Sequence, residues 1–187
     1  MFRFLGHCAA VVRPLRSSQG ATRPPRRSRR YNPSMFAMER LEARSVPSVV
    51  TITVNTLVDE TIPNDQTSLR EAIMTADGDL ANSYVINFGV TGTIDLTSDA
   101  SGTLDLGNDI TISGPGASSL TVQRDSAAAS FGIFRVDRPF KASISGITIS
   151  HGAGVDGGGI HNEGTLTVRN SVFSSNSASR DGGGLSN

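Results

Sequence analysis

Two acidic residues flank a glycine-rich stretch near the C-terminus and are the first candidates for chemistry. Asp156 precedes Gly157, Gly158 and Gly159, and Glu163 follows the same stretch. A glycoside hydrolase needs two carboxylates about 5 to 10 Å apart on one surface, one of them serving as the acid and the other as nucleophile or base. Asp156 and Glu163 could form such a pair if the turn brings them together. Catalysis at this turn is therefore one interpretation to be weighed.

A second group of candidates is the basic cluster that follows residue 134. Arg135, Arg138 and Lys141 lie close together in the sequence, with Asp137 among them. A polysaccharide lyase would use such a base beside acidic residues that hold a divalent cation. The cluster falls between two expected strands, where solvated loop charges are the simpler explanation.

Metal-binding patterns in the sequence are incomplete. His151 and His161 lie near the glycine-rich stretch, but they have neither cysteine partners nor a helical spacing, so they are expected to be exposed turn residues. Residues 152–156 match part of a calcium-binding nonapeptide, but the match occurs once and Gly158 stands where a large aliphatic residue belongs. The acidic loop 59–65 lacks the spacing of a known calcium loop. No cofactor is predicted, and calcium is the alternative left open.

The glycine-rich stretch is repeated, which favours a structural role for its polar residues. The hexapeptide 157–162, Gly-Gly-Gly-Ile-His-Asn, recurs as Gly-Gly-Gly-Leu-Ser-Asn at 182–187. Asp156 has a counterpart in Asp181, and an aspartate at the same place in two turns is typical of a turn-forming residue. This repetition makes a catalytic role for Asp156 the less favoured interpretation, and it leans against an enzyme.

Self-similarity at a nearly fixed offset is the sequence signature of a solenoid. Residues 142–149 and 166–173 align at an offset of 24, and the two hexapeptides align at an offset of 25. Equivalent turns would then stack about 4.8 Å apart, with glycines at sharp corners and asparagines hydrogen-bonded in a column. The residues expected to hold these turns are Gly157, Gly158, Gly159, Gly182, Gly183, Gly184, Asn162, Asn176 and Asn187.

Short runs with alternating apolar residues predict the strands of this solenoid. A first strand is predicted over 49–55, where β-branched residues alternate with period two. Later strands are predicted over 85–88, 92–96, 102–106, 109–113, 119–122 and 132–136, and from residue 144 onward. An antiparallel sandwich would not repeat the chemistry of its turns, so a coil of parallel strands is favoured.

One short helix is predicted over residues 68–76. Ser68 and Glu71 form a capping box, in which each side chain satisfies a backbone amide at the start of the helix. Four apolar residues lie on one helical face, and Gly78 ends the run. Because the open end of a solenoid core needs a cap, we expect this helix to cover the first end.

Residues 1–48 have a different composition from the rest of the chain. They contain ten arginines but only Glu39 and Glu42 as acids, which leaves seven of the 17 basic and fifteen of the 17 acidic residues for the remainder. They show no helical or strand periodicity, so a disordered or targeting leader is predicted, with a true start at Met35 or Met38 as an alternative. No aromatic residues interleave with the arginines, and nucleic-acid binding is not expected.

Cysteine usage and hydropathy restrict the class of protein further. Cys8 is the only cysteine, which excludes a disulfide within the chain. No apolar run approaches the roughly 18 residues of a membrane-spanning helix. Twenty glycines and no tryptophan suit short strands joined by tight bends.

The predicted helix and the repeats resemble a known group of proteins. Thr67-Ser-Leu-Arg-Glu-Ala-Ile73 resembles the signature of the CSLREA-type module that opens many bacterial right-handed parallel β-helix surface proteins, with Thr67 in place of the cysteine. Segments 112–117, 144–149 and 157–160 follow in the order that family shows. Together with Phe173-Ser-Ser-Asn176, the last segment is also similar to the GG-x-I and F-x-x-N repeats of polymorphic outer membrane proteins. The resemblance covers about residues 49–187 and implies an exported surface protein.

The sequence therefore predicts an all-β, right-handed parallel β-helix with a basic leader at 1–48, an N-terminal strand and capping helix within 49–84, and the coil over 85–187. The predicted function is structural, adhesive or ligand-binding, at the cell envelope or outside the cell, with envelope components, polysaccharides or other surface proteins as partners. The alternative is a carbohydrate-active enzyme of the lyase or hydrolase type. Because an uncovered sheet edge promotes association, further rungs or another chain are expected to pair beyond Asn187, which would make the chain a fragment.

Overall fold

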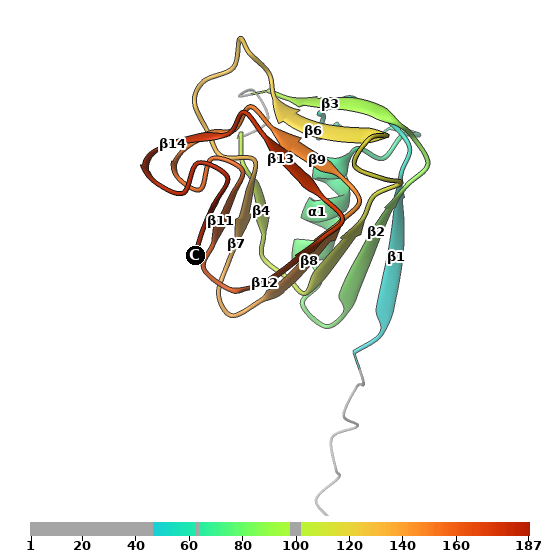
Figure 1. The fold of residues 1–187 in the computed structure, drawn as a ribbon. Helices are drawn as coiled ribbons and strands as arrows, with labels where there is room; N and C mark the ends of the chain where they lie inside the picture. The colour runs from blue at the N-terminus through green and yellow to red at the C-terminus, as the bar shows by residue number, and fades with distance from the viewer. Residues whose placement is uncertain (1–46, 63, 98–101) are drawn as a thin grey trace, which may run out of the picture. The chain divides into compact units, whose positions relative to one another are not determined.

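The strands of this chain coil into a parallel β-helix of about four turns. The structure, a computed structural model, describes residues 47–62, 64–97 and 102–187 (Figure 1). All strand pairs in this part of the chain are parallel, and neighbouring strands in each sheet belong to successive turns. The predicted fold class is confirmed. The leader predicted over 1–48 lies outside the described residues, apart from its last two positions.

Three sheets form the walls of the coil. Sheet A has the order β1 (Val49–Val54), β2 (Ser83–Phe88), β5 (Ile110–Ser113), β8 (Lys141–Ser145) and β12 (Thr165–Arg169). Sheet B contains β3 (Gly92–Leu96), β6 (Leu120–Arg124), β9 (Thr148–Ser150) and β13 (Val172–Ser174). Sheet C contains β4 (Leu104–Leu106), β7 (Phe134–Val136), β11 (Ile160–Asn162) and β15 (Leu185–Ser186). A separate two-stranded ribbon pairs β10 (Ala153–Asp156) with β14 (Ser177–Asp181).

Each turn of the coil is a rung with one strand in each sheet. Rung 1 consists of β2, β3 and β4, rung 2 of β5, β6 and β7, rung 3 of β8, β9 and β11, and rung 4 of β12, β13 and β15. The ribbon strands β10 and β14 belong to rungs 3 and 4 and lie between their sheet B and sheet C strands.

The core is made of apolar columns that run along the axis of the coil. Alternate residues of each strand point inward, so equivalent positions in successive rungs stack on one another. The columns are Ile86, Ile112, Ile144 and Val168 in sheet A, Ile94, Val122, Ile149 and Phe173 in sheet B, and Leu104, Phe134, Ile160 and Leu185 in sheet C. In rungs 1 to 3 these side chains are no more than 1% exposed, so the hydrophobic effect acts on every one of these rungs.

The corner between sheets A and B is sharper than the sequence suggests. Residues 142–149 and 166–173 resemble single strands, but each contains a bend that separates two strands. Gly146 and Asn170 mark these bends, with φ angles of 67° and 49°. Both angles lie in the left-handed region, which glycine and asparagine adopt more readily than other residues.

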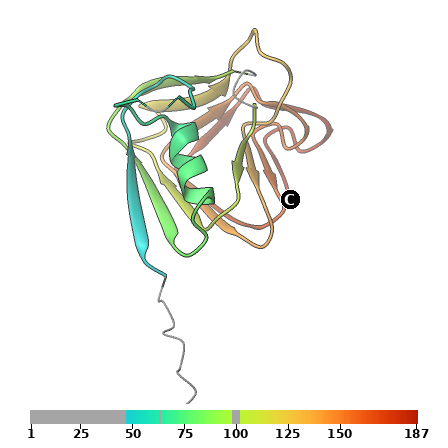
Figure 2. The ribbon, with the colours of Figure 1, turned by 180° about the vertical axis from the view of Figure 1, so that it is seen from behind.

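The helix α1 (Leu69–Asp77) closes the N-terminal end of the coil, as predicted. Ser68 Oγ accepts a hydrogen bond from the Glu71 amide at 3.1 Å, and the Glu71 carboxylate accepts one from the Ser68 amide at 2.9 Å. The buried face of α1 contacts β1, β2 and β4, and Figure 2 shows the helix lying beside these strands. Gly78 ends the helix, with a φ of −72° in the right-handed region. Its amide donates to the Met74 carbonyl at 3.1 Å.

A buried ion pair fixes the cap to rung 1. Arg70 Nε lies 2.7 Å from Asp59 Oδ1, and the two side chains are 5% and 1% exposed. Arg70 Nη2 also donates to the Gly102 carbonyl at 2.7 Å, and the Thr97 amide donates to Asp59 Oδ2 at 3.0 Å. These contacts join the loop after β1, the helix and both ends of the segment between β3 and β4.

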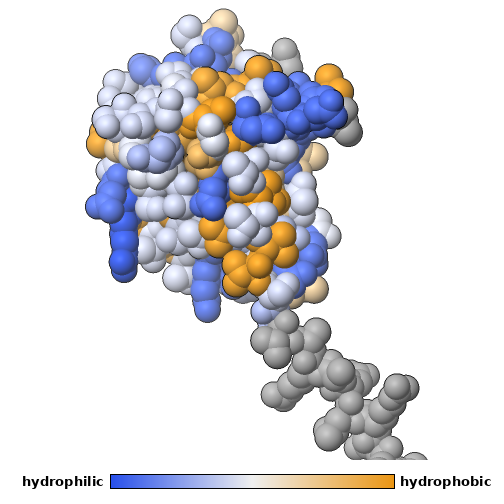
Figure 3. All heavy atoms as spheres, turned by 90° about the vertical axis from the view of Figure 1, so that its right-hand side faces the viewer, coloured by the Kyte–Doolittle hydropathy of each residue, from blue (hydrophilic) through white to orange (hydrophobic). Residues whose placement is uncertain are grey.

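The side of the coil on which β1 lies presents a mixed surface. Figure 3 shows hydrophobic patches between hydrophilic ones on this side. Several apolar side chains of the N-terminal part are exposed, among them Val49 at 66%, Val58 at 57% and Ile62 at 69%. No helix in the described part of the chain has the length and apolar character needed to cross a membrane.

Candidate functional site

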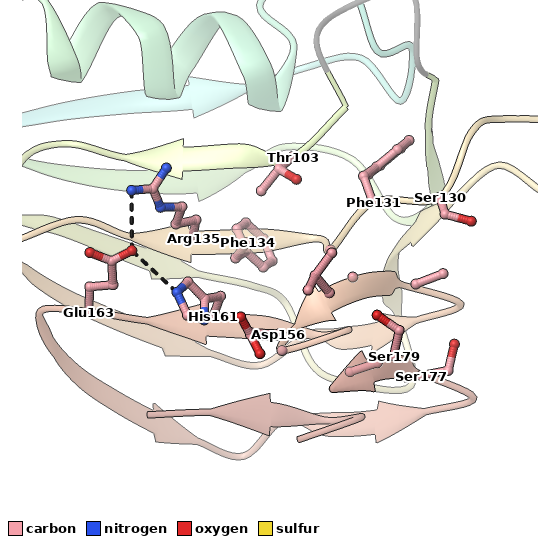
Figure 4. A pocket seen from close by; sticks show the side chains of 16 residues that line it. Thr103, Ser130, Phe131, Phe134, Arg135, Asp156, His161, Glu163, Ser177 and Ser179 are labelled. Carbon is pink, nitrogen blue, oxygen red and sulfur yellow. Dashed lines mark hydrogen bonds and ion pairs between the residues drawn. The ribbon is translucent and has the colours of Figure 1, made fainter. Parts of the chain in front are cut away.

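The main cavity of interest is a groove between sheet C and the β10/β14 ribbon. It has a volume of about 810 Å³ and lies on the outer surface of rungs 1 to 4. Thr103, Ser130 and Phe131 line one part of it, and Ser177 and Ser179 line the ribbon side (Figure 4). Arg135, His161, Glu163 and Asp156 complete the polar lining. We call this cavity the sheet C groove.

The ribbon that forms one wall contains a β-bulge. Ala153 pairs with Ser177 and Gly154 with Ala178, but Asp156 pairs with Asp181, so the second strand has one extra residue. This extra residue explains why the repeat has an offset of 24 before the bulge and 25 after it. A bulge bends its strand and redirects the side chains beside it. Here the bulge lies between Ala178 and Asp181, in the stretch of β14 that contains the lining residue Ser179.

The outer face of sheet C carries a row of polar residues. Asp105 pairs with Arg135, Arg135 with His161, and His161 with Ser186. Their neighbours in the strands point into the core, so these four side chains point outward. The row thereby places one arginine and one histidine from adjacent rungs at the floor of the groove.

Glu163 joins the arginine and the histidine of this row. Glu163 Oε1 lies 3.2 Å from Arg135 Nη2 and 3.3 Å from His161 Nε2 (Figure 4). Arg135 Nε also lies 3.1 Å from Asp137 Oδ1. All four side chains are between 30% and 45% exposed. They form a solvated charge network, whose individual pairs add little to stability.

Asp156 is held from the opposite strand of the ribbon. Its carboxylate accepts hydrogen bonds from Arg180, with Nε to Oδ1 at 2.8 Å and Nη2 to Oδ2 as the second contact. Two parallel contacts between an arginine and a carboxylate fix the orientation of both groups. The Asp156 side chain is 15% exposed, whereas that of Arg180 is 69% exposed. Both oxygens of Asp156 are therefore engaged across the ribbon.

The candidate catalytic residues are only partly brought together. Asp156 and Glu163 line the same groove, and Asp137 approaches it through Arg135. Arg138 Nε donates to the Glu163 backbone carbonyl at 2.8 Å. Lys141 lies on the outer face of sheet A beside Asp109, whose carboxylate accepts from the Lys141 amide at 2.8 Å. The sequence cluster is thus divided between two faces of the coil.

The two histidines have different surroundings. His151 is an exposed turn residue with a φ of 56°, and its Nδ1 lies 3.2 Å from Gln123 Oε1. His161 is a half-buried residue of β11 rather than an exposed turn residue, so that expectation is wrong. Its Nδ1 is buried without a hydrogen-bond partner. Because Nε2 faces Glu163, the ring is oriented by the charge network.

The two repeated glycine triplets occupy tight backbone crossings. Gly157 and Gly182 have φ angles of 61° and 64°. A Cβ at Gly158 would lie 2.1 Å from the Ser177 carbonyl oxygen, and one at Gly159 would lie 2.4 Å from that of Gly184. Backbone of neighbouring rungs packs directly at these positions, which leaves no space for a side chain.

The repeated asparagines connect rungs in two ways. Asn162 Nδ2 donates to Asn187 Oδ1 one rung further, which is the column contact that the repeat predicts. Asn176 has no asparagine in the preceding rung, where Gly152 occupies the corresponding place. Its side chain instead accepts from the Gly152 amide at 2.9 Å and donates to the Ile149 carbonyl at 2.9 Å.

Two carboxyl groups with a raised pKa lie outside the groove lining. Burial raises the pKa of Asp77 to about 6, the hydrogen bond from the Gly107 amide lowers it, and the charges of Asp105 and Asp137 raise it. The pKa of Asp105 is also raised, first by burial and then by Asp137, against the lowering effect of Arg135 and Arg70. These groups lie where sheet C approaches the end of α1, and neither lines the groove.

Several groove residues were not singled out from the sequence. Phe131 and Ser130 precede β7, and Ser177 and Ser179 lie on the ribbon. The change of offset from 24 to 25 was the one signal that pointed to an irregular strand there. Arg180 has no partner of the same type in rung 3, so the repeat could not indicate its role.

The acidic and histidine side chains were also considered as metal ligands. Within residues 47–62, 64–97 and 102–187, no three His, Cys, Asp or Glu side chains gather in a way that could hold a metal ion. In the acidic loop, Asp59 is already engaged by Arg70 and the Thr97 amide.

Comparisons of the chain with family models, curated proteins and solved structures found no match.

Proposed function

We propose that this chain is an exported β-helix protein of the cell envelope that binds a ligand in the sheet C groove without cleaving it. The observation that carries the proposal is that other side chains already engage the carboxylates of the groove. Asp156 is engaged through both oxygens by Arg180, whereas Glu163 uses one oxygen, Oε1, for its contacts with Arg135 and His161. A carboxyl pair that works as acid and base needs both members to reach the substrate, and both oxygens of Asp156 are already engaged.

The shape and chemistry of the groove support binding. Its volume of about 810 Å³ lies within the range of small-molecule sites, and it offers hydroxyl, carboxylate, imidazole and guanidinium groups. The lining comes from four rungs that are held in fixed register by parallel pairing. Such a site is preorganised, which lowers the entropic cost of binding.

The envelope location is supported by the resemblance of residues 49–187 to bacterial surface β-helix proteins. The repeated corners and the capping helix that carry this resemblance are also the parts that organise the fold. A scaffold of this kind exposes long polar faces, which suits structural or adhesive contacts with polysaccharides or other surface proteins.

The second candidate function is a carbohydrate-active enzyme. It is favoured by the fact that Asp156 and Glu163 line one groove. For this activity the Arg180 and Arg135 contacts would have to open in the substrate complex. The two candidates therefore differ in whether products with new reducing or unsaturated ends are formed.

The proposal is tested with the purified full chain and isolated cell-envelope polysaccharide. We expect the wild-type chain to cosediment with the polysaccharide and to release no reducing or unsaturated ends. Ser179→Trp, which places a bulky ring across the groove, should reduce cosedimentation at least about tenfold. Ser174→Trp is the matched control, because Ser174 is also an exposed serine of rung 4 but does not line the groove.

Two results would overturn the proposal. Equal cosedimentation of the wild type and Ser179→Trp would show that the groove is not the binding site. Accumulation of new sugar ends, abolished by Glu163→Gln, would assign the chain to the enzyme class instead.

A further inference from the structure

We infer that the ligand of the sheet C groove is an uncharged oligosaccharide segment, which is recognised by its hydroxyl groups and by one apolar sugar face. This inference rests on the proposed function and specifies its ligand. It follows from three features of the groove: a partly exposed aromatic ring, a mixed set of hydrogen-bonding groups, and charges that compensate one another.

The aromatic ring is that of Phe131. It packs against Gly102, where a Cβ would approach the ring to 3.0 Å, and it lines the groove as a half-buried side chain. In Figure 4 the ring lies at the same end of the groove as Ser130 and Thr103. An aromatic ring with hydroxyl groups beside it offers an apolar surface and a polar rim together. A sugar ring has the complementary arrangement, with an apolar C–H face and hydroxyls at its edge.

The groove offers both hydrogen-bond donors and hydrogen-bond acceptors. Arg135 offers only N–H donors, Glu163 only acceptors, and the serine hydroxyls offer both. Arg135 is 45% exposed and Glu163 is 38% exposed, so each retains capacity beyond their mutual contact. Ser177 and Ser179 add hydroxyls from the ribbon. Sugar hydroxyls donate and accept in the same way, so this set can satisfy several of them at once.

The charges of the groove disfavour a strongly charged ligand. Among the lining residues, Arg135 is the only permanent cation, and it faces Glu163 and Asp137. Asp156 is compensated by Arg180. A polyanion such as a uronic acid chain would meet two carboxylates, and a polycation would meet Arg135. A neutral chain can use every group without leaving a charge unpaired.

The length of the groove fits a chain rather than a single sugar. The lining extends from Thr103, which precedes β4 of rung 1, to Ser179 in rung 4. Successive rungs are spaced about 4.8 Å apart, so the groove crosses several of them along the axis. A segment of a few linked sugar units would contact both Phe131 and the ribbon serines.

The test is calorimetric titration of the full chain with neutral hexasaccharides from xylan, cellulose and mannan, and with a galacturonic acid hexamer as the charged probe. We expect at least one neutral hexamer to bind and the galacturonic acid hexamer to bind at least about tenfold more weakly. Phe131→Ala should weaken binding of the neutral hexamer about tenfold, whereas Phe131→Tyr, which keeps the ring, should change it less than about threefold. Removing both ribbon hydroxyls with Ser177→Ala and Ser179→Ala should cost about tenfold.

Phe88→Ala is the matched control, because Phe88 is also half-buried but lies in sheet A outside the groove. Binding that Phe88→Ala weakens as much as Phe131→Ala does would reflect lost stability and overturn the assignment of Phe131. If Phe131→Ala fails to fold, the double variant of Ser177 and Ser179 keeps the groove assignment testable.

The two proposals fail in different ways. If only the galacturonic acid hexamer binds, and Ser179→Trp blocks it, groove binding stands and the neutral ligand is overturned. If no hexamer binds, or if Ser179→Trp leaves hexamer binding unchanged, the inference of a neutral ligand is overturned. If Ser179→Trp also cosediments with envelope polysaccharide as the wild type does, the proposal of groove binding is overturned as well.

Discussion

At the scale of single residues, the stacking of rungs brings the Asp77 carboxyl under the electrostatic influence of two other carboxylates. Its Oδ1 accepts a hydrogen bond from the Gly107 amide at 3.0 Å, and the carboxylates of Asp105 and Asp137 act on it through space. Burial is the main cause of its raised pKa of about 6. An acid whose pKa is raised by folding binds more protons in the folded state, so its charge opposes folding once it ionises.

Asp77→Asn should therefore stabilise the protein at neutral pH. The amide oxygen can still accept from Gly107, while the buried charge is removed. In the wild type, the free energy of unfolding falls as the pH rises from about 4 to about 6, because the Asp77 carboxyl ionises in this window between its unfolded and folded pKa values. After a discount for partial exposure, we expect a gain of roughly 1 kcal/mol at pH 7.5.

Urea denaturation at pH 4.5 and pH 7.5 measures this effect. The advantage of Asp77→Asn should shrink at the lower pH, where the wild-type carboxyl is largely protonated. An equal advantage at both pH values would show that the effect does not come from ionisation.

The first glycine of the first triplet differs from the third glycine of the second triplet. Gly157 has a φ of 61°, and a Cβ there would lie 2.2 Å from the Ile160 carbonyl oxygen. At Gly184 the nearest atom to a Cβ would be 3.8 Å away, in the Phe173 side chain. We expect Gly157→Ala to lower the free energy of unfolding by more than about 2 kcal/mol and Gly184→Ala to change it by less than about 1 kcal/mol. Thermal denaturation of both variants decides this, and a similar loss in both would contradict the proposed corner geometry.

At the scale of elements, the cap depends on a contact that joins distant parts of the chain. Arg70 projects from the first turn of α1 to Asp59 in the preceding loop and to the Gly102 carbonyl before β4. Both charged side chains are almost completely buried. Removing one member of such a pair leaves the other without compensation.

Arg70→Met should lower the free energy of unfolding by about 3 to 5 kcal/mol, because the Asp59 charge would remain buried. Adding Asp59→Asn should restore much of this loss, since the neutral amide can still accept from Thr97. Arg180→Met serves as the control, because Arg180 is 69% exposed and its loss should cost less than about 1 kcal/mol. These values come from urea denaturation, and no recovery in the double variant would show that the arginine acts by packing alone.

The elements that repeat, and those with a local signal, could be predicted from the sequence. Ser68 and Glu71 lie one helical turn apart and specify the start of α1 by themselves. Equivalent positions in rungs 3 and 4 keep the nearly constant offset of the repeat in all three sheets, so their turns align in the sequence. The earlier rungs keep no such offset: Ile112 pairs with Ile86 on one side and with the more distant Ile144 on the other. The strands of those rungs were found from their alternation instead.

The groove could not be predicted in the same way, because it depends on contacts between rungs. Arg135 and Glu163 are 28 residues apart, and only the register of β7 with β11 brings them together. Phe131 lies in a segment without periodicity, where no pattern indicates the direction of its side chain. For Lys141, proximity in the sequence was misleading. It lies close to Arg135 and Arg138 in the sequence, but the corner between sheets C and A places it on a different face of the coil.

At the scale of the whole coil, stability should depend on the position of a rung. The column side chains of rungs 1 to 3 are no more than 1% exposed, whereas Leu185 in rung 4 is 40% exposed and Val168 and Phe173 are half-buried. In a solenoid each rung is stabilised mainly by its immediate neighbours. Among the described rungs, rung 4 has one such neighbour.

Hydrogen exchange should therefore follow the order of the rungs. We expect amides of β12 and β13 to exchange at least about tenfold faster than those of β5 and β6, because rung 4 can open without disturbing the rest. Mass spectrometry of peptides from each rung measures this. Equal protection in all four rungs would mean that the coil opens as one cooperative unit.

The connections between sheet B and sheet C are the long ones in this coil. In rungs 2 to 4 they comprise residues 125–133, 151–159 and 175–184, whereas the described connections at the other two corners of these rungs are shorter. The ribbon and Phe131 both belong to this corner, and the apolar columns do not pass through it. A foreign peptide inserted there, for example after Ser126, should be displayed on an otherwise unchanged coil. New binding specificities can thus arise one rung at a time, in the way that antibody loops vary on a constant framework.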